Sequence, residues 1–138
     1  MMSRFLKILY VFIAITFMSS CAWVGTQNDP LNGTKWRLIE LGSTPAIDGR
    51  APTMNFEAGS VRGSAGCNSF QGIYSVSGQQ IDFDELAMTL MACPDDEGVM
   101  EQERRFFSAL QGVERFELSG TELVLSAADG SSIILAAE

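Results

Sequence analysis

The feature that most constrains the fold is a series of short segments, separated by glycine-containing turns, that extends from residue 33 to residue 137. Their side chains alternate between apolar and polar with a period of two, which predicts β-strands. One stretch, residues 94–112, instead spaces its apolar side chains as a helix does, with a proline and acidic residues at its start. Seven or eight strands and one helix predict a mainly β (α+β) fold, a small antiparallel β-barrel-like domain with one helix packed against it.

We expect the individual strands where this alternation is clearest, and a loop at the Gly- and Pro-rich stretch 42–53. In the first predicted strand, 35–41, neither face is purely polar, which indicates a strand covered on both sides. Two hairpins should follow, and three antiparallel strands should close the domain after the helix. The predicted strands of the hairpins are 53–57, 61–65, 70–76 and 80–83.

The N-terminal 20 residues have the layout of a secretory signal peptide. Arg4 and Lys7 precede an apolar run, residues 8–17, that is too short for a permanent membrane span. The following "MSSC" resembles the bacterial lipobox, which implies acylation of Cys21. We therefore divide the chain into a lipoprotein signal peptide (1–20), a lipidated flexible tether (21–32) and one domain (33–138).

Composition excludes several functional classes. The chain has 9 basic and 17 acidic residues, a net charge of −8, which argues against nucleic-acid binding. It has no histidine, so the commonest general base and the commonest metal ligand are both missing. We predict no catalytic residue, no metal site and no cofactor.

Three cysteines require an explanation. If Cys21 carries lipid, Cys67 and Cys93 remain, and an even pair in an exported domain predicts a disulfide. Two interpretations stay open beside it: two buried free thiols, or a reactive thiol at Cys67, for which the sequence offers no neighbouring base.

The glycines around Asn68 favour a structural interpretation over a ligand site. Gly63, Gly66 and Gly72 allow a bulge or a tight bend, and the Asn68 side chain can satisfy local backbone groups. Ligand binding by Asn68 remains the alternative.

Two acidic clusters and three methionines also have structural interpretations. A turn and a helix N-terminus explain residues 82–85 and 95–97, although a glycosidase pair or a calcium site is an alternative for each. Packing against the core explains Met88, Met91 and Met100, and soft-metal binding is the alternative.

Two motifs together resemble the META domain family, which contains the HslJ-like heat-shock lipoproteins. They are "GCNSFQGIY" and "AMTLMACPDDEGVMEQERRFFSAL", and the resemblance extends over residues 33–137. It implies a small β-barrel-like domain with one helix, in bacterial envelope proteins linked to stress and in some cases to antibiotic tolerance, secretion or motility. It carries over no catalytic residue. The matching positions are Gly66, Cys67, Asn68, Phe70, Gly72, Tyr74, Met88, Thr89, Met91, Cys93, Glu103 and Phe106.

These observations predict a non-enzymatic lipoprotein of a Gram-negative cell envelope, held to the membrane through Cys21. Ala22 after the lipidated cysteine implies the outer membrane, facing the periplasm. We expect a monomer that acts by contact with an envelope protein. The alternatives are a carrier that binds a small hydrophobic ligand inside the barrel, and a hydrolase whose carboxylates face each other across a cleft.

Overall fold

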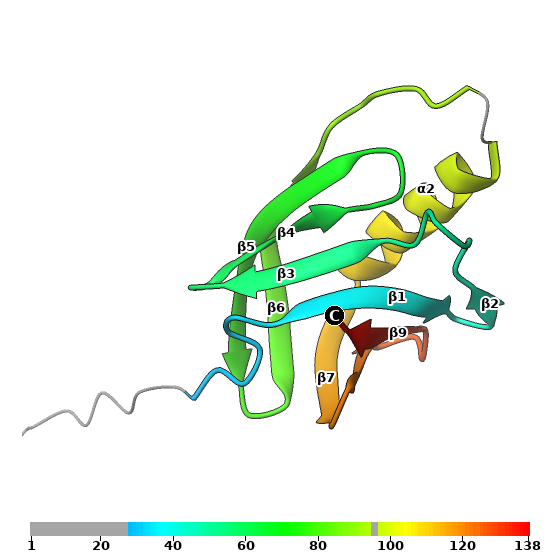
Figure 1. Ribbon diagram of the computed structural model, residues 1–138. Helices are drawn as coiled ribbons and strands as arrows, with labels where there is room; N and C mark the ends of the chain where they lie inside the picture. Colours follow the sequence, from blue (N-terminus) through cyan, green and yellow to red (C-terminus); the bar gives the residue numbers. More distant parts are fainter. Residues whose placement is uncertain (1–27, 95–96) are drawn as a thin grey trace, which may run out of the picture.

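The computed structural model describes residues 28–94 and 97–138, and the predicted signal peptide and Cys21 lie outside these ranges. The described residues form nine strands and one helix (Figure 1). The elements are β1 (Lys35–Leu41), β2 (Thr44–Pro45), β3 (Thr53–Glu57), β4 (Ser60–Ser64), β5 (Ser69–Ser77), β6 (Gln80–Met88), α2 (Glu97–Gln111), β7 (Val113–Ser119), β8 (Glu122–Ala127) and β9 (Ser132–Ala137).

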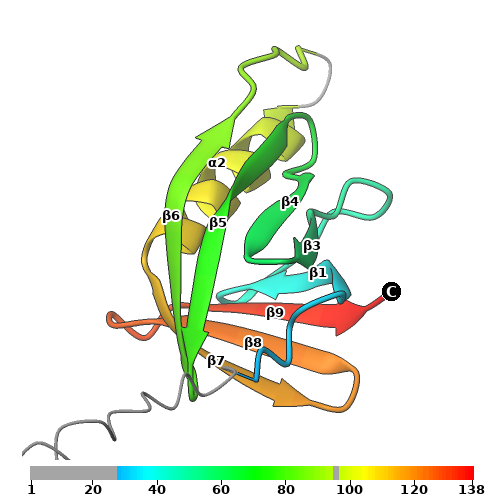
Figure 2. The ribbon, with the colours of Figure 1, turned by 90° about the vertical axis from the view of Figure 1, so that its left-hand side faces the viewer.

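Eight of the strands close into an antiparallel barrel, which confirms the predicted fold class. Neighbours follow the order β1-β3-β4-β5-β6-β7-β8-β9, and β9 pairs back with β1. The two-residue strand β2 adds to β1 inside the stretch expected to be a loop. The β6–β7 junction is held by a single paired position, Gln80↔Arg115, and α2 lies beside β6 at the other end of that strand (Figure 2). Among the described residues, no helix combines the length and apolarity needed to cross a bilayer.

Apolar side chains from every strand of the barrel and from α2 fill the barrel interior. The carrier alternative, in the form that places a ligand inside the barrel, therefore has no support. The buried hydrophobic residues are Leu31, Trp36, Leu38, Leu41, Met54, Phe56, Val61, Ala65, Phe70, Tyr74, Ile81, Val99, Phe106, Leu110, Val113, Phe116, Leu123, Leu125, Ile133 and Leu135.

β1 is covered on one side only, which corrects the expectation from its sequence. A register shift in the β1–β9 pairing lies between Leu38 and Glu40. Because a bulge inserts one extra residue, the side chains after it change face. Ile39 is 50% exposed, as alternation after the buried Trp36 and Leu38 requires, and the bulge then returns Leu41 to the core.

Three boundaries differ from the predicted ones. The strand expected at 80–83 continues to Met88, past a bulge where Glu85 adopts a positive φ of 51°. The helix begins at Glu97, after the predicted start at residue 94. Leu31, placed by sequence in the flexible tether, is fully buried, and its backbone N–H is bonded by the Asp29 carboxylate at 2.9 Å.

Candidate binding groove

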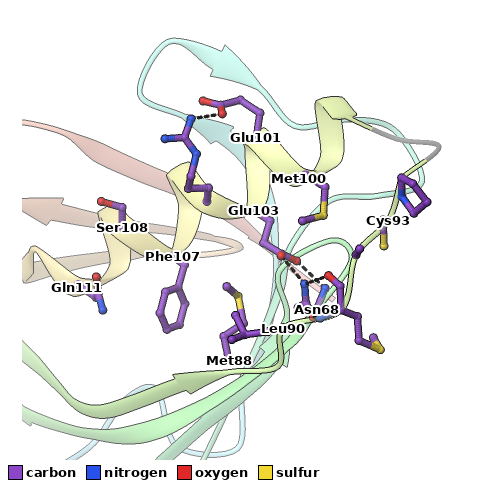
Figure 3. Close-up of a pocket in the computed structure, with 14 residues that line it drawn as sticks. Asn68, Met88, Leu90, Cys93, Met100, Glu101, Glu103, Phe107, Ser108 and Gln111 are labelled. Carbon is purple, nitrogen blue, oxygen red and sulfur yellow. Dashed lines mark hydrogen bonds and ion pairs between the residues drawn. The ribbon is translucent and has the colours of Figure 1, made fainter.

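An open groove of about 980 Å³ lies between α2 and the chain segment that continues from the end of β6, residues 88–94 (Figure 3). Met88 and Leu90 line one side, and Met100 and Phe107 line the other. Leu90 is 93% exposed, and Met91 is 58% exposed. The prediction that Met91 packs against the core is therefore wrong, because the chain has already left the barrel at this residue.

The two phenylalanines of α2 divide the helix between the core and the groove. Successive residues of a helix point about 100° apart, so Phe106 and Phe107 occupy different faces. Phe106 is fully buried and packs edge-to-face on Phe70, with ring centroids 5.8 Å apart. Phe107 is only partly buried and lies at the groove, 6.4 Å from the Phe70 ring. One helix thus completes the barrel core and forms a groove wall.

The side chain of Asn68, 2% exposed, holds the segment after β6 in place. Its Oδ1 accepts hydrogen bonds from Met91 N–H at 2.7 Å and from the Thr89 hydroxyl at 2.8 Å. Its Nδ2 donates to the Met91 carbonyl at 3.1 Å and to Glu103 Oε1 at 2.6 Å. Asn68 therefore has a structural role, but the expectation that it satisfies local backbone groups is wrong, because its side-chain partners lie 21 to 35 residues away.

Glu103 of α2 binds the turn that carries Asn68. Its Oε2 accepts the backbone N–H groups of Cys67 at 3.1 Å and of Asn68 at 2.5 Å. With the Asn68 amide on Oε1, three N–H donors solvate this carboxylate, which is 2% exposed. A buried charge of this kind is stable only when such donors surround it. Glu103 therefore fixes the position of α2 relative to the β4–β5 turn.

A disulfide joins Cys67 to Cys93 beside this network, with 6.3 Å between the Cα atoms. The predicted pairing is confirmed, and the alternatives of two free thiols or a reactive Cys67 are contradicted. The bond ties the β4–β5 turn to the end of the segment that lines the groove.

Gly66 explains why the turn before Cys67 contains a glycine. Its φ is +122°, a conformation that residues with a side chain rarely adopt. An added Cβ would also lie 3.0 Å from Val99 Cγ1 and 3.2 Å from the Arg50 carbonyl oxygen. The turn can therefore approach α2 only with glycine at this position.

The residues matched to the family motifs separate into two groups. Cys67, Asn68, Thr89, Cys93 and Glu103 meet at the groove.

Two further motif residues, Gly72 and Tyr74, act elsewhere in the barrel. Gly72 lies opposite the β6 bulge, where a Cβ would be 2.8 Å from Leu86 Cδ2. Tyr74 lies toward the other end of β5, where its hydroxyl donates to the Asp29 carboxylate.

The acidic clusters form no converging pair in the described residues. Asp82, Asp84 and Glu85 are all exposed on β6, and the Asp84 carboxylate accepts the Glu85 N–H at 2.8 Å, within the bulge. Residues 95 and 96 of the other cluster lie outside the described ranges. In the part of the chain that the structure describes, no three Cys, Asp or Glu side chains gather as a metal site would require.

The groove is suited to binding by its shape and its apolar walls. Glu103 is fully engaged by N–H donors, and Glu101 forms an ion pair with Arg104 on the exposed face of α2. Both cysteine sulfurs nearby belong to the disulfide. Among the described groove residues, no nucleophile lies beside a free base.

Sequence analysis did not identify Leu90 or Phe107 as groove residues. It explained two methionines of this stretch, Met88 and Met91, by packing against the core. The signals that the sequence offered, Pro94 and the acidic residues after it, mark the start of the helix and not the end of β6 at Met88.

The META domain family model matches residues 29–138. No curated protein matches the chain. A protein from Burkholderia xenovorans solved by NMR is similar in structure, with a TM-score of 0.68 and 20% identity over 78% of this chain and 83% of that one. A second NMR structure has a TM-score of 0.63 and 24% identity, over 77% of this chain and 90% of that one.

A crystal structure of a DUF4847 family protein from Bacteroides vulgatus has a TM-score of 0.60 and 13% identity, over 78% of this chain and 94% of that one. At these identities the three structures show the shared fold alone. The family model, in contrast, covers both cysteine motifs and the whole barrel. The chain belongs to the META domain family.

Proposed function

We propose that this protein is a non-enzymatic lipoprotein of a Gram-negative cell envelope that acts by binding another envelope protein at the groove. Cys21 anchors it in the outer membrane, and the domain faces the periplasm as a monomer. The family resemblance supports a role in the response to stress or in antibiotic tolerance. The signal-peptide layout and the lipobox-like "MSSC" support the anchor.

The observation that carries the proposal is the exposed apolar lip of the groove. Leu90 is 93% exposed and Met91 58% exposed, next to a concave surface that contains Met100 and Phe107. Burying an apolar side chain from water is worth about 1.5–3 kcal/mol, so these residues favour association with a partner. Methionines suit such a surface because their side chains adapt to different shapes.

Photocrosslinking in the native envelope tests this proposal. A photoreactive amino acid replaces Leu90 in one variant and Ile39 in a control variant. Ile39 is also an exposed apolar residue, 50% exposed, but lies on β1 away from the groove. We expect a discrete crosslinked protein from position 90 alone. Equal crosslinking at both positions, or none at position 90, would overturn the proposal.

The same experiment in a Cys21→Ala background tests the anchor. We expect the protein to leave the membrane fraction and the crosslink at position 90 to weaken, because the partner and the domain no longer share a membrane. An unchanged membrane fraction would contradict lipidation at Cys21.

A carrier of a small hydrophobic ligand is the second candidate, relocated from the barrel interior to the groove. The groove volume of about 980 Å³ supports it, since it is at the upper end for drug-sized ligand sites. Titration with an apolar fluorescent probe, N-phenylnaphthylamine, tests the carrier function. Saturable binding that Phe107→Ala abolishes would support it.

A further inference from the structure

We propose that the groove binds an extended segment of the partner protein, which adds as a β-strand beside residues 88–90 and carries basic side chains. This inference rests on the proposed function and names the form that the partner takes. It depends on which backbone groups of the segment after β6 are already bonded and which are free.

On the side of this segment that faces β5 and Asn68, the backbone groups are hydrogen-bonded. Thr89 N–H donates to the Ser69 carbonyl at 3.0 Å, as in a continued β5–β6 ladder. Two residues later, Met91 N–H and C=O bond to the two polar atoms of the Asn68 side chain. The Asn68 amide thus takes the place of a peptide group of β5, and it continues the ladder beyond the end of the sheet.

On the opposite side of the same segment, which faces away from β5, no strand pairs with the backbone groups of the described residues. In an antiparallel ladder, backbone groups point alternately toward and away from a given neighbour. Since Thr89 and Met91 point toward β5 and Asn68, the backbone groups of Met88 and Leu90 point to the other side. The β6–β7 pairing is confined to Gln80↔Arg115, so within the described residues no strand covers this edge. An edge of this kind is a template for an added strand.

The groove supplies sites for the side chains of such a strand. Met88 and Leu90 are two residues apart and lie together at the groove in Figure 3, with Phe107 opposite them. Alternate side chains of an added strand would therefore contact an apolar wall on α2. Backbone hydrogen bonds then provide affinity, and the apolar wall selects the side chains.

Charge favours a basic segment. The strand that would receive it exposes Asp82, Asp84 and Glu85, and the whole chain has a net charge of −8. Arg104, the basic residue among those lining the groove, is already paired with Glu101. Lysine or arginine on the outward face of the added strand would be attracted by this surface.

The position of the tether favours a protein over a lipid surface. The blue segment before β1, residues 28–34, lies at the end of the barrel opposite the segment 89–94 in both views (Figures 1 and 2). Asp29 is held there by the Tyr74 hydroxyl, five residues along β5 from Ser69, which is about 17 Å at the usual rise of a strand. The groove therefore lies at the end of the barrel away from residues 28–34, to which the tether leads.

The test compares two substitutions at one position in the lipidated full-length protein, reconstituted in nanodiscs. Met88→Ala and Met88→Pro both remove the methionine side chain, but only proline removes the N–H that faces the groove. The β5–β6 ladder does not use this N–H, and circular dichroism checks that both variants remain folded. The probe is an extended peptide in which valine alternates with lysine and threonine. Its affinity is measured by fluorescence anisotropy.

We expect saturable binding to the wild type and, for Met88→Pro, a binding about two- to tenfold weaker than for Met88→Ala, the effect of one lost hydrogen bond. The same peptide with alternate amides N-methylated should not bind, which is a control independent of any substitution in the protein. Equal affinities of the two variants, full binding of the methylated peptide, or no saturable binding at millimolar concentrations would overturn strand addition.

These outcomes are separable from failure of the proposed function. A crosslink confined to position 90 together with equal affinities of Met88→Ala and Met88→Pro leaves the groove as a contact surface and rejects strand addition alone.

Discussion

The two ends of the barrel are stabilised in different ways. At the end where the tether enters, Leu31 is fully buried and Phe56 packs edge-to-face on Tyr74, with ring centroids 4.8 Å apart. At the groove end, a buried amide, a buried carboxylate and a disulfide hold the chain. The apolar side chains that are exposed at the groove, Leu90 and Met91, do not contribute to the core at this end. Hydrogen bonds and a disulfide stabilise this end instead.

The largest expected effect tests the apolar end. Phe56→Ala removes a side chain that is 1% exposed and leaves a cavity against Tyr74. We expect the free energy of unfolding to fall by about 3–5 kcal/mol, measured by urea denaturation. Ile39→Ala, at an exposed position on β1, is the matched control and should change it by less than about 1 kcal/mol. Similar losses for both variants would contradict the assignment of this end to apolar packing.

The disulfide is the corresponding test at the groove end. Its removal in the double variant Cys67→Ser, Cys93→Ser should cost about 3.5 kcal/mol by chain entropy for a separation of 26 residues. The effect on dynamics should be local. Hydrogen exchange should accelerate at the Asn68 and Met91 amides and remain slow at the Phe56 amide, which bonds to the Thr34 carbonyl at 3.0 Å. Equal acceleration at both ends would show that the ends are not independent.

The smallest expected effect comes from Tyr74→Phe, which keeps the ring and removes the hydroxyl that bonds to Asp29. We expect a loss of about 0.5–1.5 kcal/mol near neutral pH, measured by urea denaturation. Burial, together with the hydrogen bond to Asp29, raises the pKa of the Tyr74 hydroxyl well above its usual value.

The raised pKa of Tyr74 also fixes the direction of a pH effect. Above about pH 10 an unfolded tyrosine loses its proton while the folded one keeps it. The free energy of unfolding therefore falls as the pH rises above 10, and Tyr74→Phe removes this part of the decline. In the chain without residues 1–20, Tyr74 is the only tyrosine, so phenolate absorbance reports it directly. A titration midpoint near 10 would contradict the buried contact.

The sequence predicted the barrel because its strands keep their alternation over most of their length. It also predicted the disulfide, because two cysteines remained once Cys21 was assigned to lipid. The predictions of burial were wrong where the chain departs from a regular strand. A bulge after Leu38 returns Leu41 to the core, where strict alternation would place it outside with Ile39. After β6 the chain leaves the sheet, so the apolar residues that looked buried are exposed at the groove.

The groove itself was not predictable by the same reasoning. Asn68 was interpreted as a residue that satisfies nearby backbone groups, but its partners at Thr89, Met91 and Glu103 come from two other segments. Periodicity reports which face of an element is buried. It does not predict which distant groups a single side chain will bond. The hydrogen bonds from Asn68 to Thr89 and Met91 hold the groove wall in place.

The opposite positions of the tether and the groove have a mechanical consequence. A pull between the membrane anchor and a bound partner would enter the domain near the Asp29–Tyr74 contact and leave it near Cys67. β5 connects these two places, and its hydrogen bonds to β4 and β6 lie across the direction of the load. The bonds would be loaded together in shear, rather than one after another as in unzipping, so the domain can transmit tension along its length while the barrel stays closed.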